Sequence, residues 1–118
     1  MNAKVKYSTI IVKDMEESIR FYKDIMGFEI DSQYTPTSDV TITLMKTKGD
    51  AMIELIKDSM HDVGFYSVGM DVEDLNAAIK ELKSKGTKII MGPVDITVGS
   101  LAFLEDPNGV RIAIIEHN

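Results

Sequence analysis

The chain has no cysteine among its 118 residues, which excludes disulfide bonds, thiolate metal sites and a cysteine nucleophile. No apolar run approaches the roughly 20 residues of a membrane span, and the first residues lack the apolar stretch of a secretory signal. Lysine and arginine form no cluster and the net charge is −6. Nucleic acid and anionic membrane are therefore not expected partners, and we expect a cytoplasmic protein.

The overall composition is that of a folded globular protein. Apolar residues make up 44% of the chain and charged residues 27%. At this length, about two-thirds of the surface of the unfolded chain can be buried on folding, which is enough for a core without disulfides or a structural metal. We expect one domain over residues 1–118.

Residue patterns predict the same order of elements twice. The first set is a strand over 5–12, a helix that begins at Asp14 and ends at Gly27, and strands near 28–34, 40–46 and 51–56. The second set is a strand over 65–72, a helix from Asp74 to Gly86, and strands near 87–91, 99–105 and 110–116. Aspartate favours a helix start, and glycine favours the left-handed residue that ends a helix.

The two sets match residue by residue. Five positions recur 60 residues later: Val12, Asp14, Met15, Ile19 and Tyr22 correspond to Val72, Asp74, Leu75, Ile79 and Leu82. After the helix the shift is 59, and Ile53-Glu54-Leu55 corresponds to Ile112-Ala113-Ile114. This repeat predicts an α+β fold of two tandem βαβββ modules, about 4–57 and 64–117. Together they would form a curved mixed sheet with the helices on its outer face.

Alternation along the strands separates two faces of this sheet. One face is apolar and is expected to contact the helices: Ile10, Val12, Ile53, Leu55, Val68, Met70, Val72, Ile112 and Ile114. The opposite face is mixed: Tyr7, Thr9, Met52, Glu54, Ile56, Ser67, Gly69, Asp71, Arg111, Ala113 and Ile115. A curved sheet with this lining suits a pocket for a modest organic ligand, although a half-exposed sheet face is also mixed.

Three segments resemble the vicinal-oxygen-chelate superfamily of glyoxalases, bleomycin-resistance proteins and extradiol dioxygenases. They are Val12-Lys13-Asp14-Met15-Glu16-Glu17-Ser18-Ile19-Arg20-Phe21-Tyr22, Met26-Gly27-Phe28, and Phe103-Leu104-Glu105-Asp106-Pro107-Asn108-Gly109. The resemblance covers nearly the whole chain. It implies the fold rather than the reaction, because one scaffold hosts many chemistries.

The resemblance also implies where a metal would bind. Metal-dependent members place ligands at the positions that here hold Tyr7, Glu54, Ser67 and Ala113, usually as histidine, glutamine or glutamate. Only Glu54 is a typical ligand for a hard metal, because alanine has no donor and serine is a weak neutral one. A divalent ion normally needs at least three protein donors, so we expect a metal-site-deficient member without a metal or other cofactor.

The candidate ligand-binding residues are Tyr7, Met52, Glu54, Ser67, Arg111 and Ala113. Glu54 is a candidate general base or an anchor for a cation, and the alternative is an internal ion pair with Arg111. Arg111 can also grip a carboxylate or phosphate, and Tyr7 offers a ring and a hydroxyl. We expect His61 and His117 to be exposed and to lie off the pocket face.

The favoured function is metal-free binding of a small molecule, as in proteins of the bleomycin-resistance type. The alternative is a glyoxalase-like lyase or isomerase that uses Glu54 as base or as its one retained metal ligand. A third interpretation is a small regulatory or interaction domain. Whether the protein is an enzyme is left open by the residues, and a homodimer is expected from the resemblance.

Overall fold

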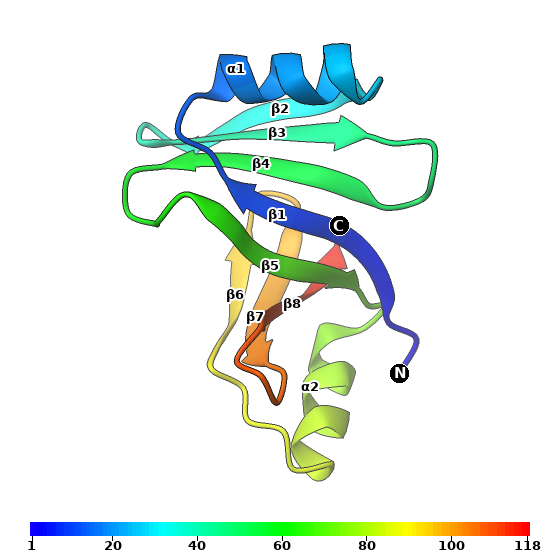
Figure 1. Ribbon diagram of the computed structural model, residues 1–118. Helices are drawn as coiled ribbons and strands as arrows, with labels where there is room; N and C mark the ends of the chain where they lie inside the picture. The colour runs from blue at the N-terminus through cyan, green and yellow to red at the C-terminus, as the bar shows by residue number, and fades with distance from the viewer. The chain divides into compact units, whose positions relative to one another are not determined.

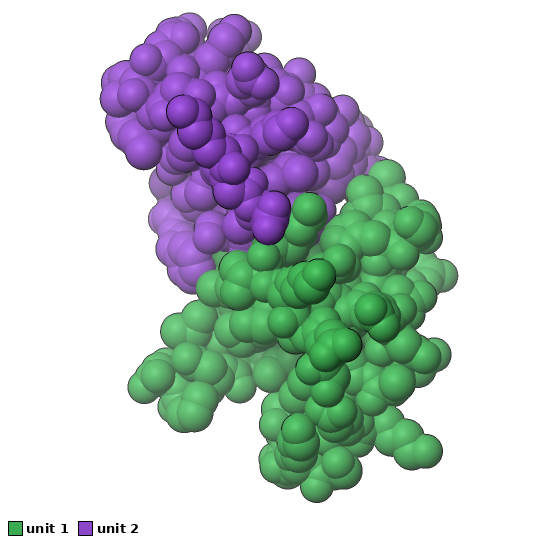
Figure 2. Space-filling model, turned by 90° about the vertical axis from the view of Figure 1, so that its right-hand side faces the viewer, with its two compact units in different colours: residues 1–6, 67–118 green, residues 7–66 purple.

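The computed structural model describes residues 1–118, which form two compact units. The unit called first here, because it comes first in the chain, consists of residues 7–66 and is drawn in purple as unit 2 in Figure 2. The second consists of residues 1–6 and 67–118 and is drawn in green as unit 1. The predicted modules, about 4–57 and 64–117, stay predictions, and residues 4–6 lie in the second unit. That the whole chain is a single domain stays a prediction. None of the helices combines the length and the apolar content that crossing a bilayer requires.

The first unit is a four-stranded mixed sheet with one helical segment (Figure 1). Its elements are β1 (Lys4–Ile11), α1 (Met15–Arg20), the π-helical turn η1 (Phe21–Ile25), β2 (Glu29–Thr37), β3 (Val40–Lys46) and β4 (Met52–Asp58). The strand order is β2-β3-β4-β1. β1 pairs parallel with β4, and the other pairs are antiparallel. The predicted βαβββ order is confirmed.

The second unit repeats this arrangement. Its elements are β5 (Gly64–Asp71), α2 (Leu75–Ser84), β6 (Met91–Ile96), β7 (Gly99–Glu105) and β8 (Arg111–His117), in the strand order β5-β8-β7-β6. β5 pairs parallel with β8, as β1 does with β4. Thr9 lies opposite Glu54, and Gly69, 60 residues after Thr9, lies opposite Ala113, 59 residues after Glu54. The repeat in the sequence is therefore a repeat in strand register.

Both helices begin where the sequence predicts, and α2 also ends there. In the first unit α1 ends at Arg20, and the π-helical turn η1 continues to Ile25, close to the predicted end at Gly27. The side chains of Asp14 and Asp74 each accept a hydrogen bond at 3.0 Å from the backbone N–H three residues later. Each bond satisfies a donor that the first helical turn leaves unpaired. Gly27 and Gly86 follow the two helical segments with φ of +78° and +86°. Residues other than glycine rarely adopt a φ in this range.

Each unit has its own core between its helix and its sheet. In the first unit, buried Val12, Met45 and Leu55 pack with residues of β1, β4, the helical segment and the connection to β2: Ile10, Met15, Ile19, Tyr22, Phe28 and Ile53. In the second unit the buried cluster is Val72, Leu75, Ala78, Ile79, Ala102, Leu104 and Ile114, with Met70, Leu82, Ile89 and Ile112 packed against it. The opposite face of each sheet is thereby left for other contacts.

One predicted strand is wrong in its position. The strand predicted near 87–91 is β6, and it spans Met91–Ile96. Its third residue is Pro93, which has no N–H to donate to a ladder. Proline is tolerated here because β6 is an edge strand that pairs with β7 alone, with a register shift between Met91 and Val94. The residues near 87–91 that were predicted as a strand therefore lie mostly before β6.

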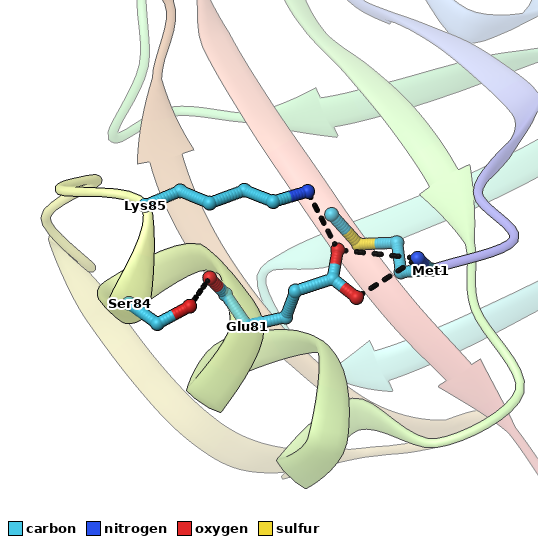
Figure 3. A network of polar contacts seen from close by, with 4 residues as sticks. All are labelled: Met1, Glu81, Ser84 and Lys85. Carbon is cyan, nitrogen blue, oxygen red and sulfur yellow. Dashed lines mark hydrogen bonds and ion pairs between the residues drawn. The ribbon is translucent and has the colours of Figure 1, made fainter.

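The N-terminal residue is joined to α2 within the second unit (Figure 3). The Met1 amino group donates to both carboxylate oxygens of Glu81, at 3.0 and 3.1 Å, and Lys85 Nζ donates to the same carboxylate at 3.1 Å. The hydrogen bond from the amino group, and then that from Lys85, hold the pKa of Glu81 below its usual value. The network is exposed, so we regard it as a local tether.

Candidate functional site

In the first unit, the face of the sheet opposite α1 carries three of the six candidate residues. Tyr7 lies opposite Met52 across the β1–β4 ladder, and Glu54 lies two residues further along β4. Side chains two residues apart share a face, so Tyr7, Met52 and Glu54 all point away from the helix. Tyr7 is buried, whereas Met52 and Glu54 are half-buried.

A short hydrogen bond fixes the Glu54 carboxylate. Thr9 Oγ1 donates to Glu54 Oε1 at 2.6 Å from the opposite position on β1. Thr9 is 3% exposed, so its hydroxyl has little access to water. Hydrogen bonds to ionised acceptors are short and strong, and this one holds the carboxylate in one orientation on the face. Alternation had assigned Thr9 to this face, but the bond itself was not predicted.

Tyr34 is a further group that interacts with Glu54 and was missed by the sequence. It lies on β2 opposite Ile42 of β3. Burial raises the pKa of the Tyr34 phenol above its usual value, and the negative charge of Glu54 raises it further. The phenol therefore stays protonated at neutral pH and keeps a donor hydrogen. A register shift between Ile30 and Ser32 breaks the alternation along β2, so its faces could not be read from the sequence.

In the second unit, the corresponding face carries the other three candidates. Ser67 on β5 is 3% exposed and Ala113 on β8 is 5% exposed. They share this face because Ala113 lies opposite Gly69, which is two residues from Ser67 on β5. Arg111 is exposed at the start of β8, opposite Glu105. The predicted pairing of Arg111 with Glu54 joins residues of different units and stays a prediction.

His117 is not the exposed, off-face histidine that the sequence predicted. It is half-buried, and its Nδ1 lies 2.6 Å from Oδ1 of Asp71. The predicted strand stopped at residue 116, but β8 continues through His117. Alternation from Ala113 through Ile115 then places His117 on the candidate face. Asp71 lies opposite Ile115 on that face.

His61 is exposed, as predicted, in the segment between β4 and β5. Its Nδ1 lies 2.9 Å from Oδ2 of Asp58, and its Nε2 lies 3.4 Å from the Tyr66 hydroxyl. The Asp58 contact spans three residues and is local. It ties down the connecting segment.

The side chains at the four positions that the resemblance implies for metal ligands are not a donor set that suits a divalent cation. In the first unit the positions hold a phenol, Tyr7, and a carboxylate, Glu54. In the second unit they hold Ser67, a neutral hydroxyl, and Ala113, a methyl group without a donor. No three histidine, cysteine, aspartate or glutamate side chains of the chain are grouped to hold a metal ion. This donor set falls short of the three or more protein ligands that such an ion normally requires.

Comparisons with known proteins place the chain in a family. The model of the glyoxalase/bleomycin resistance protein/dioxygenase superfamily matches residues 4–114. A probable lactoylglutathione lyase of Synechocystis is 29% identical over 121 residues, covering 93% of this chain and 92% of that protein.

Solved structures agree on the fold. A methylmalonyl-CoA epimerase from Mycobacterium tuberculosis aligns with a TM-score of 0.83 at 20% identity, covering 97% of this chain and 87% of the other. A methylmalonyl-CoA epimerase in complex with methylmalonyl-CoA and NH4+ also gives 0.83, at 17% identity, covering 99% and 96%. Because the family model matches residues 4–114, the chain belongs to the glyoxalase/bleomycin resistance protein/dioxygenase superfamily.

Proposed function

We propose that this protein binds a small molecule without a divalent cation. The ligand would contact Tyr7, Met52 and Glu54 of the first unit, and the candidate residues of the second unit, Ser67, Arg111 and Ala113, stay predictions from the sequence. The observation that carries the proposal is the hydrogen bond from Thr9 to Glu54. The one carboxylate at the positions that the resemblance implies for metal ligands accepts a hydrogen bond from a hydroxyl of its own unit, and the other three positions lack a typical metal donor.

The chemistry of the first-unit face favours a ligand with a hydrogen-bond donor or a positive charge. Glu54 accepts hydrogen bonds, and an acidic chain attracts cations in general. Tyr7 adds an aromatic ring, and Met52 adds a flexible apolar contact that adapts to irregular shapes. A ligand that combines an apolar body with an amine or hydroxyl group can contact all three of these side chains.

Calorimetric titration and ligand-observed NMR against glycopeptide antibiotics, aromatic antibiotics and methylmalonyl-CoA test the proposal. We expect at least one stoichiometric ligand whose affinity is unchanged by a chelator. Glu54→Gln should weaken that ligand by about tenfold or more, because a charged acceptor is lost. Glu29→Gln, at an exposed glutamate of the same unit, is the matched control and should leave the affinity unchanged. No binding at high micromolar concentration to any of these ligands contradicts the proposal.

A second candidate function is a lyase or isomerase in which Glu54 removes a proton. Its support is the fixed orientation of the carboxylate by Thr9, together with the lyase and epimerase names of the relatives. Epimerisation at a carbon requires loss of its proton, so methylmalonyl-CoA incubated in D2O would exchange that proton if the protein catalysed it. Exchange that is lost in Glu54→Gln and retained in Glu29→Gln would establish catalysis. Unchanged proton signals favour stoichiometric binding.

We also propose a homodimer, in keeping with the expectation from the resemblance. Size-exclusion chromatography with light scattering measures the mass directly. A mass near twice 13.1 kDa supports the dimer, and a mass near 13.1 kDa contradicts it.

A further inference from the structure

Four large apolar side chains of the first unit are exposed on the helical segment and the start of β2. Their exposed fractions run from 42% to 71%, and they are Phe21, Ile25, Met26 and Ile30. η1 contacts β2, and Ile30 lies opposite Met45, on the side of the sheet that faces the helical segment. These four residues, the apolar patch, therefore lie on neighbouring elements. Single exposed apolar residues are common, whereas a group of them together is typical of an interaction site.

The π-helical turn η1 moves part of this patch away from the core. Met15, Ile19 and Tyr22 follow the period of an α-helix and pack on the sheet, and a regular α-helix would place Met26 in the same row. Instead, the Met26 N–H donates to the Phe21 carbonyl oxygen, five residues back, at 3.2 Å. The wider turn moves Met26 out of that row, and its side chain is exposed. Turns of this kind are frequent at functional sites.

Two opposite charges lie beside the patch on the outer side of the helical segment. Arg20 directly precedes Phe21, and Asp24 directly precedes Ile25. Arg20 and Asp24 are both exposed, and neither is a partner in an ion pair within the chain. Both charges are therefore available to a partner that covers the patch.

The arrangement of these residues is complementary to itself. A two-fold axis that relates two copies makes each contact twice, with residue i of one copy against residue j of the other and j against i. If two antiparallel helical segments cross at residues 22–23, Phe21 of one copy lies against Ile25 of the other. Arg20 then lies beside Asp24. The midpoints of the two pairs are residues 23 and 22, so a single axis serves both.

We propose that the apolar patch is the interface between two copies of this chain, with Arg20 of each copy beside Asp24 of the other. This inference rests on the proposed homodimer and names its contact surface. Both copies bury the patch, so apolar area is removed from water twice. The charge pairs at the rim favour the antiparallel arrangement over a parallel one, in which like charges would meet.

Ile25→Lys tests the interface, with size-exclusion chromatography and light scattering over a range of protein concentrations. The dimer dissociation constant should rise by about 100-fold or more, because the charge enters the interface twice. Met60→Lys, at an apolar residue of the same unit that is 84% exposed and lies outside the patch, is the matched control. It should leave the dissociation constant unchanged. Circular dichroism should show that both variants are folded, because both side chains are exposed.

A charge exchange tests the antiparallel arrangement. Arg20→Asp and Asp24→Arg should each weaken the dimer by about tenfold or more, because each brings like charges together across the axis. The double variant restores opposite charges and should recover most of the wild-type affinity. Lys13→Asp makes the same change in charge outside the patch and should leave the affinity unchanged. A double variant that is as weak as the single variants overturns the proposal.

The outcomes separate this interface from the homodimer itself. A wild-type protein that is a monomer at every concentration overturns both. A wild-type dimer that persists unchanged in Ile25→Lys, or that dissociates equally in Met60→Lys, overturns the interface and leaves the homodimer standing. Small-molecule binding in the titrations above is decided separately from either result.

Discussion

Removal of the Thr9 hydroxyl tests whether the Thr9–Glu54 hydrogen bond stabilises the first unit. Thr9→Val keeps the shape of the side chain and deletes the donor. A hydrogen bond to a charged group contributes about 1.5–3 kcal/mol. Thr9 is 3% exposed, so water cannot replace the hydroxyl from that side, but Glu54 is only half-buried and can be partly rehydrated. We therefore expect a loss of about 2 kcal/mol in the free energy of unfolding.

Urea unfolding followed by circular dichroism measures this loss. Thr9→Ser keeps the hydroxyl and is the control, expected to retain most of the stability. In a double-mutant cycle with Glu54→Gln, the two substitutions should be non-additive, because Thr9→Val removes the donor of this bond and Glu54→Gln removes the charge that strengthens it. A Thr9→Val protein within about 0.5 kcal/mol of wild type, which is typical of surface changes, would refute the reasoning.

Three further predictions concern Tyr34, a crowded glycine and the helix caps. Because the pKa of Tyr34 is raised in the folded state, its contribution to stability is present below the usual tyrosine pKa of about 10 and is lost as the pH rises through the raised value. Tyr34→Phe should therefore lose less stability than wild type between pH 9 and 11 in urea titrations, and equal losses would contradict this. Gly99→Ala should destabilise the protein by about 3 kcal/mol, because its Cβ would overlap the backbone carbonyl oxygen of Glu116. Gly49→Ala, whose Cβ would have its nearest atom at 3.8 Å, should be nearly neutral in the same assay. Asp14→Ala and Asp74→Ala should each cost about 1 kcal/mol and add in the double variant, and thermal unfolding that shows no loss would contradict the caps.

Features determined by local patterns were predictable from the sequence. The Asp14 and Asp74 caps depend on a few consecutive residues, as do the glycines that end the helical segments. The βαβββ order and the two faces of β1, β4, β5 and β8 follow from short-range alternation. The internal repeat adds a check, because a position in one module predicts its counterpart in the other. Strand register then reproduces that correspondence.

Features determined by distant pairing were not predictable. The Thr9–Glu54 bond joins residues 45 positions apart and depends on the parallel register of β1 and β4. The placement of Tyr34 near Glu54 depends on the irregular β2–β3 ladder. The position of β6 depends on its being an edge strand, which tolerates Pro93. The side on which His117 points was predicted wrongly because the predicted strand ended at residue 116. The alternation of faces was therefore not extended to His117.

The central claim is that the duplicated fold carries a ligand-binding face without a divalent metal. Elemental analysis of protein purified without chelator, followed by equilibrium dialysis against Ni²⁺, Zn²⁺, Mn²⁺ and Fe²⁺, tests it most directly. We predict far less than one equivalent of each ion, with no difference between the wild-type protein and Glu54→Gln. A full equivalent of any of these ions in the wild-type protein that is lost in Glu54→Gln would contradict the claim.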